Sequence, residues 1–162
     1  MRVYYLEMTS ADSLSAKQQP DNFTVSEARV KQYQINRLLY QLVGEPWDWT
    51  DRLEHSDAEW RDYVERDELR TWLAYSQGSI AGYYELEKRK DGDIEIAYFG
   101  LTPQFISMGF GGYFLSHAIE SAWAWEGAKR ITVNTCSLDH PSAIQNYQAR
   151  GFKVYREVSR EK

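Results

Sequence analysis

The stretch that decides the fold reads DIEIAYFGLTPQFISMGFGGYFL and spans residues 93–115. It starts with an apolar, β-rich run, and a short polar loop after Pro103 then leads to the glycine-rich segment 109–112. The apolar residues that follow predict a helix. A glycine loop between a strand and a helix leaves backbone N–H groups unpaired at the helix N-terminus, where the helix dipole adds positive charge. We therefore expect this loop to bind a phosphate compound.

Two common phosphate-binding motifs do not fit this loop. A dinucleotide fingerprint needs a third glycine three residues after the second, and Phe114 stands there. A P-loop needs Gly-Lys-Ser or Gly-Lys-Thr, and the chain contains no such triplet. Because a glycine loop also suits a plain tight turn, the phosphate hypothesis needs support from elsewhere in the sequence.

Residues 135–152, which read TCSLDHPSAIQNYQARGF, supply that support. They contain a predicted helix with Ala143 and Tyr147 one turn apart, followed by Gly151-Phe152. With the glycine loop, this segment resembles the GNAT superfamily of N-acetyltransferases, which bind acetyl-CoA. The Ala, Tyr, Gly and Phe of the family pattern Asn-x-x-Ala-x-x-Leu-Tyr and Gly-Phe are all present.

The match to the family has two departures. In the pyrophosphate motif Gln/Arg-x-x-Gly-x-Gly/Ala both glycines are kept, but Ile106 replaces the polar first residue. In the later pattern His140 stands where Asn is usual. The resemblance runs from about residue 93 to residue 155, and it implies a fold, a cofactor and a set of site residues.

Composition sets broad limits on the class of protein. A chain of 162 residues is expected to form a single domain, 1–162. Within it we expect acceptor-side elements over roughly 1–66 and a CoA-binding core over roughly 93–155. The net charge of −5 argues against nucleic acid as the main partner and favours a cationic acceptor such as an amine.

Targeting features point to the cytoplasm. One cysteine excludes a disulfide framework and suits a reducing compartment. The first residues, MRVYYLEMTS, lack the apolar core of a signal peptide, and no apolar run approaches membrane-spanning length. We therefore expect a cytoplasmic protein with no membrane partner.

The predicted elements alternate as β-α-α-β-β-β-α-β-α-β, which is an α/β fold with a mixed sheet of about six strands and helices on both faces. The order also resembles the GNAT core. Thr24 and Glu27 fit a capping box and predict a helix from there to about Leu42. Asp91-Gly92 predicts a hairpin turn.

One end of the sheet is expected to lack a strand. Family members usually add a seventh strand, and only residues 160–162 follow the last predicted strand here. The edge is then either short and open or covered by another subunit, and we hypothesise a homodimer.

The resemblance also assigns chemical roles. An alkylamine with a pKa near ~10.4 is mostly protonated at neutral pH, so a base must take its proton before it attacks a thioester. Glu95 has the spacing of the base glutamate in histone acetyltransferases of the superfamily, and Glu85 is the alternative base. Tyr147 is expected to be the general acid for the departing thiolate. The competing interpretations are a solvent-facing strand carboxylate for Glu95 and a core tyrosine for Tyr147.

The resemblance further implies how acetyl-CoA is held. The backbone around Phe99 and Leu101 is expected to pair with the pantetheine arm, and His140 either contacts the cofactor or caps the helix that begins near Pro141. The pyrophosphate is expected to contact the loop residues Met108, Gly109, Phe110, Gly111 and Gly112.

The segment Trp47-Asp48-Trp49 lies where GNAT proteins commonly build the acceptor wall, so Trp47, Trp49 and Glu85 are candidate acceptor-binding residues. The alternative is that at least one tryptophan closes the core. The three histidines lack zinc-ligand spacing, and no metal is proposed.

Taken together, the sequence predicts an N-acetyltransferase that moves the acetyl group of acetyl-CoA to a primary amine of a small molecule or peptide. The reaction is expected to proceed by direct attack in a ternary complex. One alternative is a catalytically silent domain that binds CoA or a partner. The other is an acyltransferase with a different acyl group or a hydroxyl acceptor.

Overall fold

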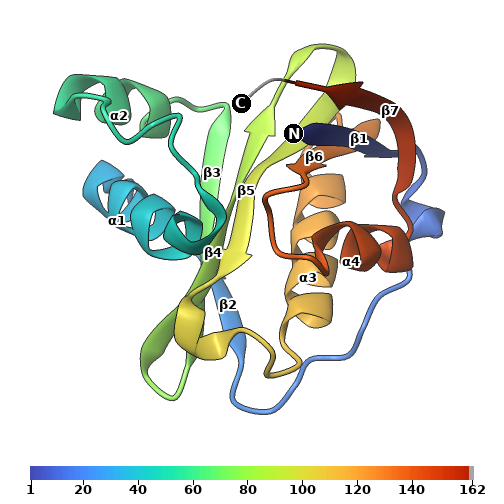
Figure 1. The fold of residues 1–162 in the computed structure, drawn as a ribbon, viewed down its shortest axis with the longest axis horizontal. Coiled ribbons are helices and arrows are strands. Elements are labelled where there is room, and N and C mark those ends of the chain that lie inside the picture. Colours follow the sequence, from blue (N-terminus) through green and yellow to red (C-terminus); the bar gives the residue numbers. More distant parts are fainter. Residues whose placement is uncertain (161–162) are drawn as a thin grey trace.

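The computed structural model describes residues 1–160, which form a seven-stranded mixed sheet with four α-helices (Figure 1). The strands are β1 (Arg2–Met8), β2 (Thr24–Glu27), β3 (Leu69–Ser76), β4 (Ser79–Lys88), β5 (Asp93–Leu101), β6 (Arg130–Cys136) and β7 (Lys153–Ser159). The helices are α1 (Tyr33–Gly44), α2 (Asp57–Val64), α3 (Gly111–Ala124) and α4 (Ala143–Arg150). In the sheet the strands lie in the order β2-β3-β4-β5-β6-β1-β7. The predicted α/β class and mixed sheet are confirmed.

The helices cover both faces of the sheet, α1 and α2 on one face and α3 and α4 on the other (Figure 1). Each face buries its own cluster. Ile94 and Ile96 of β5 pack with Phe114 and Ile119 of α3. On the other face, Tyr98 packs with residues of α1 and α2. Since side chains alternate along a strand, β5 contributes to both clusters.

Within residues 1–160, β5 and β6 form the only parallel strand pair, and it is also the shortest pair. Pairing covers only Asp93 with Arg130, Ile94 with Ile131, and Glu95 with Thr132. Beyond Glu95 and Thr132, β5 and β6 are no longer paired with each other. The other edge of β5 stays paired to β4 as far as Leu101. The sheet is therefore split along the second half of β5.

A bulge in β5 accompanies the split. Against β4 the register passes from Leu86 with Ile96 to Glu85 with Tyr98, which leaves Ala97 as the extra residue. A bulge bends its strand and re-aims the side chains that follow. Gly100 is not the bulge itself; a Cβ there would overlap the Cγ1 atom of Val43, so glycine at this position lets α1 pack directly on β5.

The prediction of a helix starting at Thr24 is wrong. Residues 24–27 form β2, which pairs antiparallel with β3, and α1 begins only at Tyr33. Val25 packs against the core there. Pairing with a strand far along the chain has overridden a local capping signal, and the sheet has seven strands instead of six.

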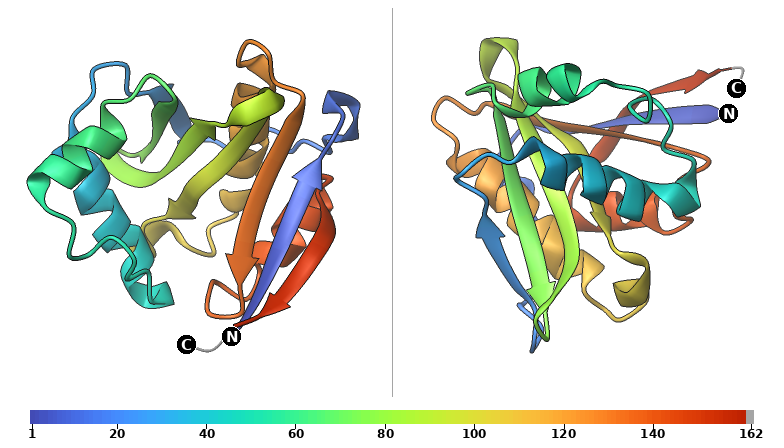
Figure 2. Two further views of the ribbon diagram at one scale, coloured as in Figure 1. Left: turned by 90° about the horizontal axis from the view of Figure 1, so that it is seen from above. Right: turned by 90° about the vertical axis from the view of Figure 1, so that its left-hand side faces the viewer.

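The first strand has an unexpected neighbour on each side. β1 lies between β6 and β7 and pairs antiparallel with both (Figure 2). The last strand, β7, is therefore a sheet edge that is backed by the N-terminal strand. The homodimer hypothesised for this edge remains a prediction. The Asp91-Gly92 turn is confirmed, since both residues have positive φ (62° and 83°) between β4 and β5.

Within residues 1–160, none of the helices has the length and apolar character needed to cross a bilayer. The same residues contain no group of three or more His, Cys, Asp or Glu side chains placed to hold a metal ion.

Candidate functional site

A cavity of about 940 Å³ opens where β5 and β6 separate. Most of its wall residues come from four segments that are distant in sequence. These segments are the loop after α1 (within 47–52), the second half of β5 (95–101), the loop into α3 (within 106–112), and the end of β6 with α4 (within 133–147). The cavity therefore brings together the predicted cofactor half and the predicted acceptor half of the chain.

At one end, the cavity meets the N-terminus of α3. The approach loop has positive φ at Ser107 (68°) and Gly109 (83°). The helix starts at Gly111, and its N-cap, Phe110, provides no side-chain hydrogen bond to the amides of the first turn. Both features leave backbone N–H groups available for an anion.

The residues predicted for the pyrophosphate lie mainly in this wall. Gly109, Phe110, Gly111 and Gly112 line the cavity, whereas Met108 is half exposed and does not. The amide of Asn146 on α4 donates to the carbonyl of Gly111 (3.2 Å), which ties α4 to the start of α3.

Phe99 and Leu101 also line the cavity. Both are paired to β4 on one side, opposite Tyr84 and Gly82, and have no strand on the other. The Phe99 ring packs on Phe114 of α3, with 5.0 Å between ring centroids. A fixed strand with one unpaired edge can accept an extended ligand as an added strand.

Tyr147 projects from α4 into the same cavity, with only 7% of its surface exposed. Its ring lies 6.4 Å from that of Phe99 and 6.0 Å from that of Phe152. Burial, with a smaller contribution from the charge of Asp139, raises the pKa of Tyr147 above its ordinary value. The phenol is thus protonated at neutral pH and can donate a proton.

His140 lines the cavity and also caps the turn before α4. Its Nδ1 atom accepts a hydrogen bond from the backbone amide of Ser142 (3.0 Å), and its ring meets Trp47 edge-on at 5.1 Å. Both readings of His140, capping and cavity contact, are thus compatible with its position.

Trp47 and Trp49 both line the cavity, and Trp49 also packs against the core on this face of the sheet; a role for either in binding the acceptor stays a prediction. The indole N–H of Trp49 donates to Oδ1 of Asp139 (3.2 Å), and the Trp49 ring packs against Tyr40 and Tyr98. The other carboxylate oxygen of Asp139 accepts from the hydroxyl of Thr135 (2.5 Å) and the amide of Cys136 (3.1 Å). Asp139 therefore joins the loop after α1 to the end of β6 across the cavity.

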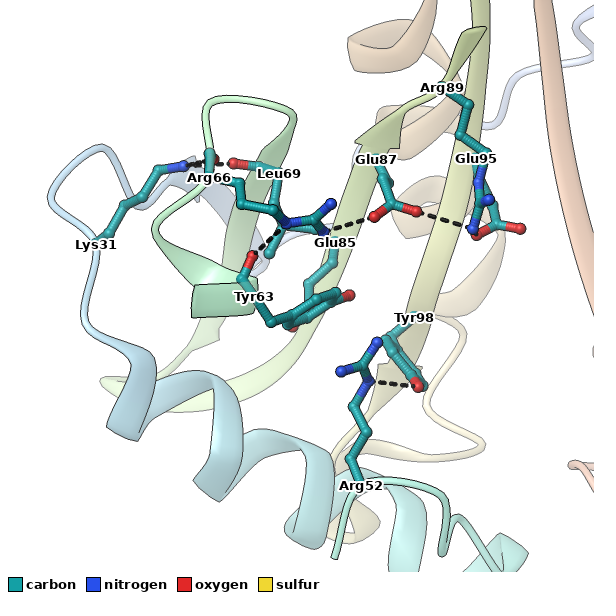
Figure 3. Close-up of polar contacts among 10 residues, drawn as sticks. All are labelled: Lys31, Arg52, Tyr63, Arg66, Leu69, Glu85, Glu87, Arg89, Glu95 and Tyr98. Atoms are coloured by element: carbon teal, nitrogen blue, oxygen red, sulfur yellow. Dashed lines mark hydrogen bonds and ion pairs between the residues drawn. The ribbon is translucent and has the colours of Figure 1, made fainter. Parts of the chain in front are cut away.

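Glu95 lies on the α1–α2 face of β5, because it alternates with Ile94 and Ile96, which are buried under α3. It lines the cavity and pairs with Arg89 (2.9 Å), which also pairs with Glu87 (2.8 Å) on the neighbouring strand (Figure 3). Arg66 completes this ion-pair group through Glu87 (2.6 Å).

Glu85 is buried, with 1% of its surface exposed, and is absent from the cavity wall. One carboxylate oxygen accepts from the hydroxyl of Tyr63 (2.6 Å) and the other from the amide of Asn36 (2.8 Å). Burial raises the pKa of Glu85, an effect that these hydrogen bonds and the charge of Arg52 oppose. Tyr63 itself lines the cavity, so the contact of Glu85 with that space is indirect.

Sequence reasoning missed Arg52, Tyr63 and Tyr98, three further cavity residues. The Nε atom of Arg52 donates to the hydroxyl of Tyr98 (3.1 Å), and its guanidinium lies 3.7 Å from the centroid of the Tyr63 ring. Burial raises the pKa of Tyr98 to about 12. No short motif marks these residues, because they come from a loop, a helix and a strand.

Comparison with known proteins agrees with this architecture. Residues 36–152 match the Acetyltransferase (GNAT) family. A comparison with curated proteins found no match.

Solved structures share the fold at low sequence identity. A GCN5-related N-acetyltransferase from Kribbella flavida is similar with a TM-score of 0.68 and 16% identity, covering 97% of this chain and 56% of that one. A GCN5-related N-acetyltransferase from Sphaerobacter thermophilus has a TM-score of 0.73 and 13% identity, covering 96% of this chain and 49% of that one. The present chain thus spans about half the length of these two proteins.

A third structure, AAC(6')-Iy in complex with the bisubstrate analog CoA-S-monomethyl-acetylneamine, has a TM-score of 0.63 and 16% identity, covering 86% of this chain and 97% of that one. At such low identity, these three structures show a shared fold only. The family assignment comes from the family match, which spans more than two thirds of the sequence. The chain belongs to the GNAT family of acetyltransferases.

Proposed function

We propose that this protein transfers the acetyl group of acetyl-CoA to a primary amine of a small molecule or peptide. One observation carries the proposal. The split between β5 and β6 opens onto a helix N-terminus without a side-chain cap, and the buried Tyr147 lines the same cavity. The complex of AAC(6')-Iy with a CoA-linked bisubstrate analog supports it from a protein of similar fold.

The residues present fit the cofactor. In this proposal the amides around Gly109, Gly111 and Gly112 hold the pyrophosphate, since positive φ and the absence of a side-chain cap leave them free to donate. The unpaired edge of Phe99 and Leu101 holds the pantetheine arm. Acetyl-CoA supplies the activated acetyl group as its thioester.

Glu95 and Tyr147 are proposed to move the protons. Glu95 takes a proton from the acceptor ammonium, directly or through water, and its pairing with Arg89 holds the carboxylate in place. As the amine nitrogen forms its bond to the acetyl carbon, the carbon–sulfur bond breaks. The hydroxyl of Tyr147 then gives its proton to the sulfur, and the second proton that the nitrogen loses passes through water and restores the phenol.

Two measurements test the proposal. Calorimetry should detect binding of CoA, and a thiol-release assay over a panel of amines should detect acetylation of at least one. The variants Glu95→Gln and Tyr147→Phe should abolish most turnover. Glu65→Gln on the surface of α2 and Tyr155→Phe on the exposed edge strand are the matched controls and should retain it.

A catalytically silent CoA-binding domain is the second candidate, and the ion pair between Arg89 and Glu95 favours it because the proposed base already has a charged partner. Binding of CoA without acetylation of any amine would select this candidate. Failure to bind CoA would overturn both. We also propose a cytoplasmic location and a homodimer, which fractionation and sedimentation test.

A further inference from the structure

The acceptor end of the cavity contains an arginine whose charge has no ion-pair partner. Arg52 lines the cavity, and among residues 1–160 it forms no ion pair with a carboxylate. Within residues 1–160, its side chain makes one hydrogen bond, the donation from Nε to the hydroxyl of Tyr98. Since a guanidinium carries five donors, most of its hydrogen-bonding capacity is left for a ligand.

The position of Arg52 is fixed from three sides. Its backbone amide donates to the hydroxyl of Tyr40 (3.2 Å), its Nε atom to that of Tyr98, and its guanidinium stacks on the ring of Tyr63. The hydroxyl of Tyr63 is in turn held by the buried carboxylate of Glu85. A guanidinium that is held in place before binding loses less freedom when a ligand arrives.

Among the acidic side chains of the cavity wall, which include Asp48, Asp51 and Asp139, two glutamates are engaged by other arginines. Glu87 pairs with Arg66 and Arg89, and Glu95 pairs with Arg89. Figure 3 shows Arg52 pointing toward Tyr98, apart from the ion-pair group formed by these residues. Arg52 is thus available for an anion that the described residues do not provide.

We infer that Arg52 binds a carboxylate of the acceptor, so that the acceptor is a small amine that also carries a carboxylate, of the amino-acid class. This inference rests on the acetyl transfer proposed above. A carboxylate matches the planar fork of a guanidinium, which can donate two parallel hydrogen bonds to it.

Glu95 and the Tyr98 residue that holds Arg52 occupy neighbouring positions on β5. Glu95 lies opposite Glu87 and Tyr98 lies opposite Glu85, two residues further along β4. Two residues of a strand span about 7 Å. An acceptor whose ammonium faces Glu95 and whose carboxylate faces Arg52 therefore bridges neighbouring positions on one face of the sheet.

The test compares amines that differ only at the carboxylate. The panel consists of the common α-amino acids, their α-carboxamides, and amines without an acidic group, including an aminoglycoside. Thiol release measures kcat/KM for each acceptor, and calorimetry measures binding of the same compounds to the protein with and without CoA. For the preferred acceptor, the carboxylate form should exceed its carboxamide by about 10- to 100-fold.

Variants at Arg52 locate the effect. Arg52→Met should remove the preference for the carboxylate form, and Arg52→Lys, which keeps the charge but lacks the planar fork, should retain part of it. Arg61→Met is the matched control, because Arg61 also lies over a tyrosine ring (Tyr33, 5.0 Å) but does not line the cavity. It should leave the preference unchanged.

The outcomes separate this inference from the acetyl-transfer proposal. Equal kcat/KM or affinity for carboxylates and carboxamides, a preference that survives in Arg52→Met, or a stronger response to the aminoglycoside would each overturn the role of Arg52. Loss of CoA binding would overturn the acetyl-transfer proposal instead, and carboxylate binding to the free protein would still report on Arg52. If no panel member binds or reacts, the amino-acid assignment is wrong.

Discussion

The two ends of the cavity differ in the groups that line them, backbone amides at one end and side chains at the other. Around the start of α3, the wall consists of main-chain amides and glycines within one continuous segment. At the acceptor end, Arg52, Tyr63, Tyr98 and Glu95 come from a loop, a helix and a strand, and their side chains define the chemistry. A site made from local backbone geometry leaves a motif in the sequence, whereas a site made from converging side chains does not.

The acceptor end should produce the largest single effect. Glu95→Gln removes the proposed base, and general-base catalysis typically contributes about 10²- to 10⁴-fold in rate. We expect kcat to fall by that factor while the affinity for CoA, set at the other end of the cavity, stays the same. Steady-state kinetics and calorimetry on one preparation check both. A rate within a few-fold of the parent enzyme would assign Glu95 to the ion-pair group alone.

The junction between the two ends is the contact of α1 with β5. Gly100→Ala places a Cβ against Val43, so we expect a loss of about 1–3 kcal/mol in the free energy of unfolding from overpacking. Urea denaturation measures it. The double variant Gly100→Ala with Val43→Ala should recover part of the loss. If the effects of the two single changes simply add, the new Cβ does not clash with Val43 and the overpacking explanation is wrong.

The cofactor end can be tested with a pair of matched glycines. Gly109 and Gly78 have almost the same φ (83° and 82°), and a Cβ at either would meet nothing within 4 Å. Alanine at positive φ costs roughly 1–2 kcal/mol at both positions. Only Gly109→Ala should also weaken CoA binding, by about tenfold, because only Gly109 lines the cavity. Equal CoA affinity in the two variants would place the pyrophosphate elsewhere.

The smallest expected effect concerns the buried carboxylate behind Tyr63. Because burial raises the pKa of Glu85, the folded state keeps this proton to higher pH than the unfolded state does. Glu85 therefore makes the free energy of unfolding fall as pH rises above the ordinary glutamate value of 4.5, until the folded group also ionises. Glu85→Gln should remove this fall. Denaturation midpoints at pH 4 and pH 7 measure it, with Glu65→Gln as control, and identical pH slopes in parent and variant would refute the shift.

Most of the strands and helices were predictable because their signals are local. The hairpin at Asp91-Gly92 and the start of α3 follow from residues a few positions apart. The helix predicted at Thr24 failed because its capping signal competes with pairing to β3, almost fifty residues away. The insertion of β1 between β6 and β7 was not predictable for the same reason.

The candidate site divides in the same way. Glu95 and Tyr147 were predicted from the resemblance to the GNAT superfamily and the loop glycines from their place before a helix, and all of them line the cavity. Arg52 was missed, since nothing near it in the sequence shows that two tyrosines from other elements will hold it. Glu85 was also predicted from the sequence as a site residue, but only the structure shows that it lies behind Tyr63.

The amino-acid sequence alone determined the family, the order of the main elements and the glycine loop, because backbone conformation depends on neighbouring residues. The tertiary structure decided where the sheet splits, that Glu95 and not Glu85 lines the cavity, and that Arg52 lines it without an ion pair among residues 1–160. These properties depend on burial and on distances between side chains remote in sequence, and such distances exist only once the chain has folded.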